Sequence, residues 1–330
     1  MHSTLVLRRK TENPWGSAIR VTSAGLVRAY AQPMWDGTGG RYDPSALRGL
    51  IETERGRADR AAAVARRHEG LLGTATEAMR PFHRRMAELH RATERKHRAA
   101  ATLHSGYLDA VGRWADRPAE PAVVPPAFMT AVADASGVES LVVTLFGLAG
   151  RDSAVVVSDP VAARVHDLEE VLGEGPSRDT PLRAGVCSEP ELSWRWPRFG
   201  PAAREFGIHA VVSAPLGLPE ALLGTFTAYR SEAEPDVGVA RSVGVFAEAL
   251  TETALNPAVR LDLADGLPVH PLFGDLDRRV VVHQATGMVM AAHDCSVSDA
   301  QAMLRAHAFA REESVTELAQ AIVAGTYRLT

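Results

Sequence analysis

Four histidines recur at seven-residue intervals in the N-terminal half of the chain: His83, His90, His97 and His104. Imidazole binds metals and titrates near neutral pH, so such a stripe could hold an ion or sense pH. On one helix, however, residues seven apart lie about 10 Å apart along the axis, too far for two of them to share an ion. We therefore expect a solvated or partner-facing stripe, and we predict no metal site.

The two cysteines, Cys187 and Cys295, are far apart and form no Cys-x-x-Cys pair. A disulfide framework and a zinc ribbon are both unsupported, and the composition fits a reducing cytoplasm. No apolar segment follows the basic residues near the N-terminus, and no uncharged apolar stretch of about 18 residues occurs. We expect a cytoplasmic protein without a membrane segment.

The patterns expected of common enzymes are missing from the chain. The His166-Asp167 and His293-Asp294 pairs lack the further ligands of an HD-type hydrolase, and no nucleophile elbow, Walker motif or HExxH motif occurs. The Gly173–Pro176 segment lacks the Gly-Lys-Ser/Thr of a phosphate loop, and Glu174 would repel phosphate. We read this segment as a turn, and we expect a non-enzymatic protein with no cofactor.

The elements that would position these residues form an α+β chain in several parts. Residues 1–43 mix Gly, Pro and Trp, which predicts a disordered or loosely ordered lead. Residues 44–117 have the composition of long helices, broken or kinked at Pro81. Their second half carries a heptad seam that predicts either a coiled coil that dimerises or a helix packed on the next domain. The seam comprises Met79, Phe82, Met86, Leu89, Thr93, Lys96, Ala100, Leu103, Tyr107 and Ala110.

Residues 118–255 begin with a proline-rich linker and then predict an antiparallel sheet with flanking helices. Alternating β-branched and aromatic residues indicate paired strands at 141–146 and 153–157, and a hairpin at 209–214 and 222–229. Helical spacing at 127–136 and 235–255 predicts the helices that close this domain.

A linker at 256–271 precedes a three-helix bundle at 272–330. Helices are expected from about 275 to 293, after Ser296 and after Ser314, whose partner Glu317 completes a capping box. Gly287 in the first helix costs about 1 kcal/mol relative to Ala, which close approach of a neighbouring helix would explain.

The middle of the chain resembles a GAF domain of the type found in actinobacterial regulators that combine GAF and ANTAR domains. The resemblance rests on residues 168–176, 196–199, 202–203, 207–208, 214–216, 223–225 and 229–230. It implies a sensor for an unidentified small molecule. Ser177 stands where relatives often have Cys after the Gly-Glu-Gly-Pro turn. Candidate pocket residues are Cys187, Trp194, Trp196 and Phe199, although packing at the edge of the core would equally explain the aromatic residues and core packing would explain Cys187.

The C-terminal bundle resembles an ANTAR domain over about residues 272–327. Residues 284–290, 295–300, 303–308, 315–319 and 322–323 carry the resemblance in order and spacing. It implies three helices that bind paired RNA hairpins in nascent transcripts, prevent a terminator from forming, and act as a homodimer. The packing motif would comprise Ala285, Gly287, Met288, Ala300, Leu304, Leu318 and Ala319.

By this resemblance, RNA contacts would fall on Arg279, Thr286, Arg305, His307 and Arg311, each of which could also be an ordinary solvated side chain. The chain has a net charge of −4, and residues 272–330 hold five Arg, no Lys and seven acids. Any RNA surface must therefore be local. The alternative is a sensor that acts through a protein partner, with a bundle that no longer binds RNA.

Overall fold

The computed structural model describes residues 43–116, 126–146, 152–179, 185–188, 190–218, 221–234, 237–255, 270–274, 276, 280–311 and 313–329. The predictions for the lead at 1–42, for the proline-rich linker at 118–125 and for positions 256–269 of the second linker lie outside these residues.

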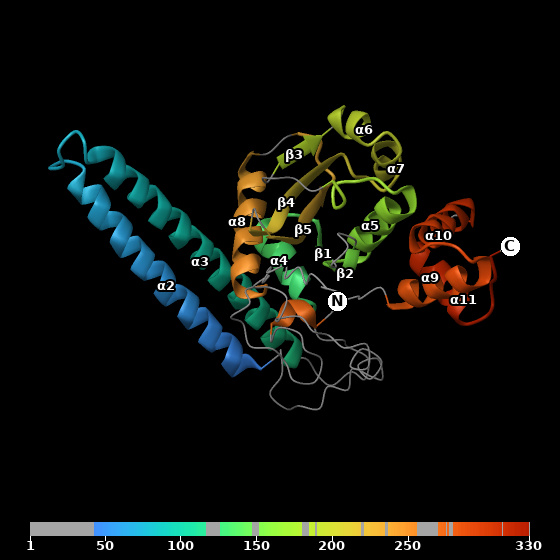
Figure 1. Cartoon of the computed structure of the whole chain (residues 1–330). Helices are drawn as coiled ribbons and strands as arrows, with labels where there is room; N and C mark the ends of the chain where they lie inside the picture. Colours follow the sequence, from blue (N-terminus) through green and yellow to red (C-terminus); the bar gives the residue numbers. More distant parts are fainter. Residues whose placement is uncertain are drawn as a thin grey trace, which may run out of the picture.

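Two long helices, α2 (Pro44–Leu71) and α3 (Arg80–Ala115), form an antiparallel hairpin that projects from the rest of the protein (Figure 1). Asp43 caps α2 by accepting a hydrogen bond from the Ser45 backbone N–H at 2.8 Å. Pro81 lies in the first turn of α3, where its missing N–H costs nothing. The predicted break at Pro81 is therefore the turn between the two helices.

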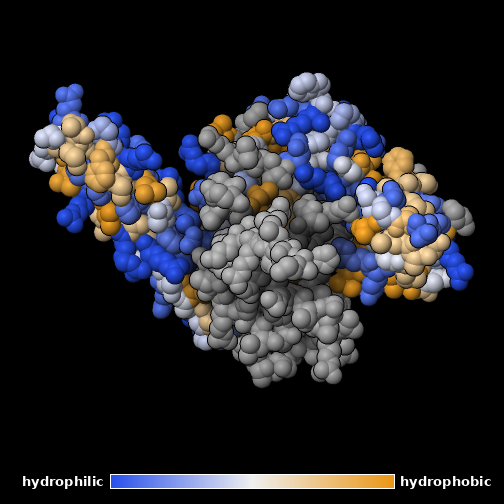
Figure 2. Space-filling view, in the orientation of Figure 1, coloured by the Kyte–Doolittle hydropathy of each residue, from blue (hydrophilic) through white to orange (hydrophobic). Residues whose placement is uncertain are grey.

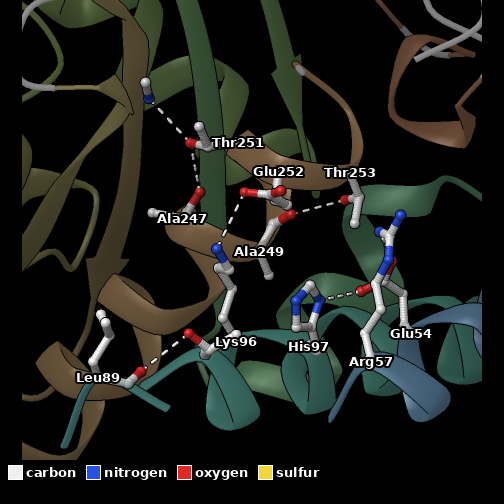
Figure 3. Close-up of polar contacts among 12 residues, drawn as sticks. Glu54, Arg57, Leu89, Lys96, His97, Ala247, Ala249, Thr251, Glu252 and Thr253 are labelled. Carbon is white, nitrogen blue, oxygen red and sulfur yellow. Dashed lines mark hydrogen bonds and ion pairs between the residues drawn. The ribbon is translucent and has the colours of Figure 1, made fainter. Parts of the chain in front are cut away.

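Three of the four histidines of the stripe, His83, His90 and His97, face α2 rather than solvent. The Nδ1 atoms of His83 and His68 lie 2.9 Å apart, and His97 Nδ1 lies 2.6 Å from Glu54 Oε2, as Figure 3 shows for His97. His90 stacks against the His68 ring. The stripe is thus partner-facing within the same chain: these three histidines face α2, and His104 lies against His270.

The heptad seam divides between two environments. Its C-terminal part, with Ala100, Leu103 and Tyr107, is buried against α4 (Phe128–Ser136) and α8 (Val237–Thr253). Lys96 adds an ion pair at 3.1 Å to Glu252 of α8 (Figure 3). At the other end Met79, Phe82 and Leu89 are exposed. Within the chain, the seam serves mainly to pack the hairpin on the sheet domain, which we define as residues 126–255.

The sheet domain is built on five antiparallel strands in the order β2-β1-β5-β4-β3. The strands are β1 (Ser140–Phe146), β2 (Asp152–Val157), β3 (Gly185–Ser188), β4 (Ala210–Leu218) and β5 (Ala221–Arg230). The two predicted strand pairs and the antiparallel sheet are confirmed, whereas β3 was not predicted because four residues carry too little periodicity.

Each face of the sheet has its own core. Helices α3, α4 and α8 cover one face, with Leu141, Val143 and Phe226 buried beneath them. Three further helices cover the other face: α5 (Pro160–Leu172), α6 (Glu191–Arg195) and α7 (Phe199–Glu205). Because successive residues of a strand point to opposite faces, Val142 and Tyr229 belong to this second core.

The C-terminal bundle comprises α9 (Val280–His293), α10 (Val297–Arg311) and α11 (Val315–Val323), seen beside α5 in Figure 1. Ser314 and Glu317 form the predicted capping box. The short η1 helix (Pro271–Phe273) precedes the bundle, yet Leu272 and Phe273 are buried in the first core of the sheet domain. Among the helices that the structure describes, none has an apolar stretch long enough to cross a membrane.

Candidate functional site

The bundle encloses a separate hydrophobic core. Five members of the predicted packing motif lie in this core with no exposed surface: Ala285, Ala300, Leu304, Leu318 and Ala319. They come from all three helices and hold them together. The remaining surface of the bundle is where any RNA contact must lie.

Gly287 and Met288 do not belong to the packing core, and the prediction for them is wrong. A Cβ added to Gly287 would meet no atom within 4 Å, so no neighbouring helix approaches it closely. Met288 is 46% exposed. Helix α9 is apolar on nearly all sides, with Val280, Val281 and Ala291 among its residues, so the sequence pattern could not tell which side faces its neighbours.

Thr286 lies inside the bundle rather than on its surface. Its side chain is buried, and its hydroxyl donates a hydrogen bond at 2.7 Å to the Val282 carbonyl one turn earlier. In this arrangement RNA cannot reach Thr286. Arg279, another predicted contact, lies outside the described residues.

His307 and Arg311 lie one turn apart on α10, and both contact Tyr327. The Arg311 guanidinium stands over the Tyr327 ring at 4.5 Å, and His307 Nδ1 lies 3.0 Å from the Tyr327 hydroxyl. Arg311 also donates two hydrogen bonds to Glu313, which raise the pKa of the Arg311 guanidinium above its ordinary value. Tyr327 thus brings together His307 and Arg311, both of which were predicted. Tyr327 itself was not predicted from the sequence, because it follows the last helix.

Arg305 lies on another side of α10, toward the sheet domain. A Cβ added to Gly173, at the end of α5, would lie 3.9 Å from Arg305 Nε. Arg305 is half-buried at this contact. Two of the predicted RNA contacts therefore share one surface, and Arg305 occupies a contact between the two parts of the protein.

The predicted pocket residues of the sheet domain are separated. Cys187, Trp196 and Phe199 are buried in the second core, where the two aromatic rings meet edge to face at 6.1 Å. Trp194, in contrast, is 84% exposed, so its grouping with the others is wrong. Trp194 belongs to α6, whereas Trp196 follows the last residue of that helix with a non-helical backbone (φ −127°, ψ 85°), so helical spacing does not keep the two indoles together.

A buried polar cluster, not predicted from the sequence, lies on the same face of the sheet. The Glu169 carboxylate of α5 accepts hydrogen bonds from the Ser177 backbone N–H at 2.8 Å and from the Tyr229 hydroxyl at 2.5 Å. Thr227 and Ser213 join the Ser177 hydroxyl to β5 and β4. All five side chains are buried. The cluster fixes α5 and the turn after it against the sheet.

The Gly173–Pro176 segment is a turn, as predicted, and Glu174 has a definite role in it. Its carboxylate accepts hydrogen bonds from the backbone N–H groups of Arg198 and Phe199 at the start of α7. Gly175 has a φ of 148° and no room for a Cβ beside Glu169.

Among the described residues, no group of three or more His, Cys, Asp or Glu side chains could hold a metal ion.

The fold and these sites define a protein in which an antiparallel-sheet domain carries the α2–α3 hairpin and a compact three-helix module. Residues 272–323, from η1 through α11, match the family model of the ANTAR domain. ANTAR domains are RNA-binding modules of transcription antitermination regulators. No curated protein matches the chain.

Proposed function

We propose that this protein is a signal-responsive, non-enzymatic regulator that binds paired RNA hairpins through its bundle and thereby controls transcription termination. The observation that carries this proposal is the coincidence of the ANTAR match with a complete, capped and separately packed bundle. The sheet domain would act as a GAF-like sensor of an unidentified small molecule. Such a regulator would work in the cytoplasm, where nascent transcripts are made, and as a homodimer that engages both hairpins.

The surface around Tyr327 suits the recognition of an unpaired base. Unstacked loop bases are bound by stacking on aromatic rings or on guanidinium planes, combined with hydrogen bonds to their edges. Arg311 over the Tyr327 ring offers such a flat surface, with His307 at its side. A closed A-form stem offers no comparable access to base edges, so the proposal favours binding to hairpin loops.

The charge of the bundle limits how the RNA can be held. With seven acids against five arginines at residues 272–330, non-specific attraction to the phosphate backbone is weak. We therefore expect binding that depends strongly on loop sequence and only modestly on salt.

The test is a gel-shift titration of the full chain against an RNA with two adjacent hairpins, beside a loop-scrambled RNA, at physiological salt. Arg311→Gln removes the stacked guanidinium and should weaken loop-dependent binding about tenfold, which corresponds to the lower part of the range for one stacked base. Arg241→Gln is the matched control, because Arg241 is exposed on α8, away from the bundle. Equal binding of the intact and scrambled RNAs would refute the proposal.

Exposed apolar side chains on the bundle favour a second candidate function, contact with a protein partner. Met288, Val297, Phe309 and Val323 are all exposed, and Figure 2 shows apolar residues across this part of the surface. In this alternative the bundle has kept its fold and lost RNA binding. Absence of loop-dependent binding by a protein shown by mass measurement to be dimeric would favour it.

A further inference from the structure

Helix α5 contacts both parts of the protein with opposite sides. Its inner side packs Ala162 and Val165 into the second core and places Glu169 in the buried polar cluster. Val171 follows Glu169 by two residues and therefore points about 200° away from it. There Val171 packs against the core of the bundle, and both α10 and α11 contact α5. Figure 1 shows the bundle lying alongside this helix.

The same contact holds Arg305 at the C-terminal end of α5. Helix α5 ends at Leu172 and is capped by Gly173, and a Cβ added to Gly173 would lie 3.9 Å from Arg305 Nε, so the guanidinium stands close to the C-terminus of the helix. The C-terminus of a helix carries partial negative charge and attracts cations. An RNA phosphate would use the same guanidinium. The helix end and the RNA therefore compete for Arg305.

We propose that the packing of the bundle on α5 is an autoinhibitory contact, which covers Arg305 and must open before the bundle binds RNA. This inference rests on the RNA-binding function proposed above and adds its regulation. The bundle stays attached after release, since only residues 274–279 separate η1 from α9. Six residues span about 20 Å at most, which permits separation from α5 without loss of proximity.

The buried polar cluster provides a route by which the sheet domain could control this contact. Glu169 ties α5 to Ser177 and to Tyr229 of β5, and Gly175 leaves no space between the following turn and the Glu169 side chain. Any change in the sheet domain that breaks these hydrogen bonds shifts α5. Because Val171 lies on that helix, its surface for the bundle shifts with it.

The experiment uses the full chain and two readouts. Val171→Asn replaces the apolar contact by a polar side chain, and Val237→Asn is the matched control at a position that is 71% exposed on α8. Hydrogen exchange measures docking through peptides of α10 and of the end of α5. Gel shift measures affinity for the two-hairpin RNA and its loop-scrambled control. Val171→Ala serves as a milder variant should Val171→Asn fail to fold.

If about nine molecules in ten are docked, opening the contact raises the apparent RNA affinity about tenfold, because affinity scales with the competent fraction. We expect faster exchange in α10 and this gain for Val171→Asn, a smaller gain for Val171→Ala, and no change for Val237→Asn.

Two results would overturn the inference while leaving the proposed function intact. One is faster exchange with unchanged loop-dependent affinity, and the other is unchanged exchange in a folded Val171→Asn protein. Loss of loop-dependent binding in every variant, docked or released, would instead refute the proposed function and this inference with it.

Discussion

We predict that a buried pair of histidines makes the stability of the protein depend on pH. His104 of α3 and His270 before η1 are each 1% exposed, and their Nε2 atoms lie 2.9 Å apart beside the Phe128 ring. The Leu272 backbone N–H donates to His270 Nδ1, so the proton of His270 is on Nε2 and is donated to His104. Adding a proton to His104 Nε2 or to His270 Nδ1 would break one of these hydrogen bonds.

Burial lowers the pKa of both histidines below the ordinary value of 6.5, and for His270 the charge of His104 lowers it further. A nearby Glu54 opposes this shift at His104 only in part. As the pH falls through 6.5, the unfolded chain therefore takes up protons before the folded protein does. The neutral histidine pair contributes fully to the free energy of unfolding above about pH 7.5. This contribution decreases as the solution becomes more acidic.

The loss follows from the linkage between protonation and folding. Each histidine that stays neutral in the folded protein lowers the free energy of unfolding by about 1.4 kcal/mol between about pH 7.5 and pH 5.5, so the loss for the pair is at most about 2.7 kcal/mol. His104→Leu combined with His270→Asn removes both titrating groups, and Asn can still cap η1. Urea unfolding at several pH values, with wild type and double variant side by side, measures the difference. Equal pH slopes for the two proteins would refute the reasoning.

Three further predictions concern stability, each measured by thermal and urea unfolding. Gly287→Ala should stabilise the bundle by about 0.5–1 kcal/mol, because Ala is the better helix former and its Cβ meets no atom within 4 Å; a loss would mean that α9 is packed more closely there. Tyr229→Phe should cost about 2 kcal/mol, because it removes a buried hydrogen bond to the Glu169 carboxylate, whereas an unchanged midpoint would show that this bond contributes little. Ser314→Ala should cost about 1 kcal/mol through loss of the capping box, with Ser298→Ala at an exposed position as the control.

Local patterns predicted the elements well, and contacts between distant residues decided what the sequence could not show. The antiparallel strand pairs follow from the residue pattern within each strand and the short connections between them, and the cap at Ser314 involves a residue three positions away, which is why both could be predicted. The Glu169–Tyr229 hydrogen bond joins residues 60 positions apart, and no local pattern marks it. Gly287 was misplaced because α9 is apolar on nearly all sides and therefore carries little signal for its orientation. Tyr327 escaped because it follows the last periodic segment, although an aromatic residue just beyond a helix is a usable signal.

The boundary between the sheet domain and the bundle lies at one place in the sequence match and at another in the structure. The ANTAR match begins at residue 272, yet Leu272 and Phe273 are buried in the core of the sheet domain, next to the His104–His270 pair. The first residues of the matched region thus anchor the bundle to the domain before it. The bundle is held at this anchor and again at Val171 of α5, so a change in the sheet domain can open the second contact while the first remains closed. Protonation of the histidine pair would act on the other contact, the anchor. Acid should therefore loosen the anchor at η1, whereas a change in the buried polar cluster should loosen the contact of the bundle with α5. Faster hydrogen exchange at η1 would report the first effect, and faster exchange at α10 would report the second.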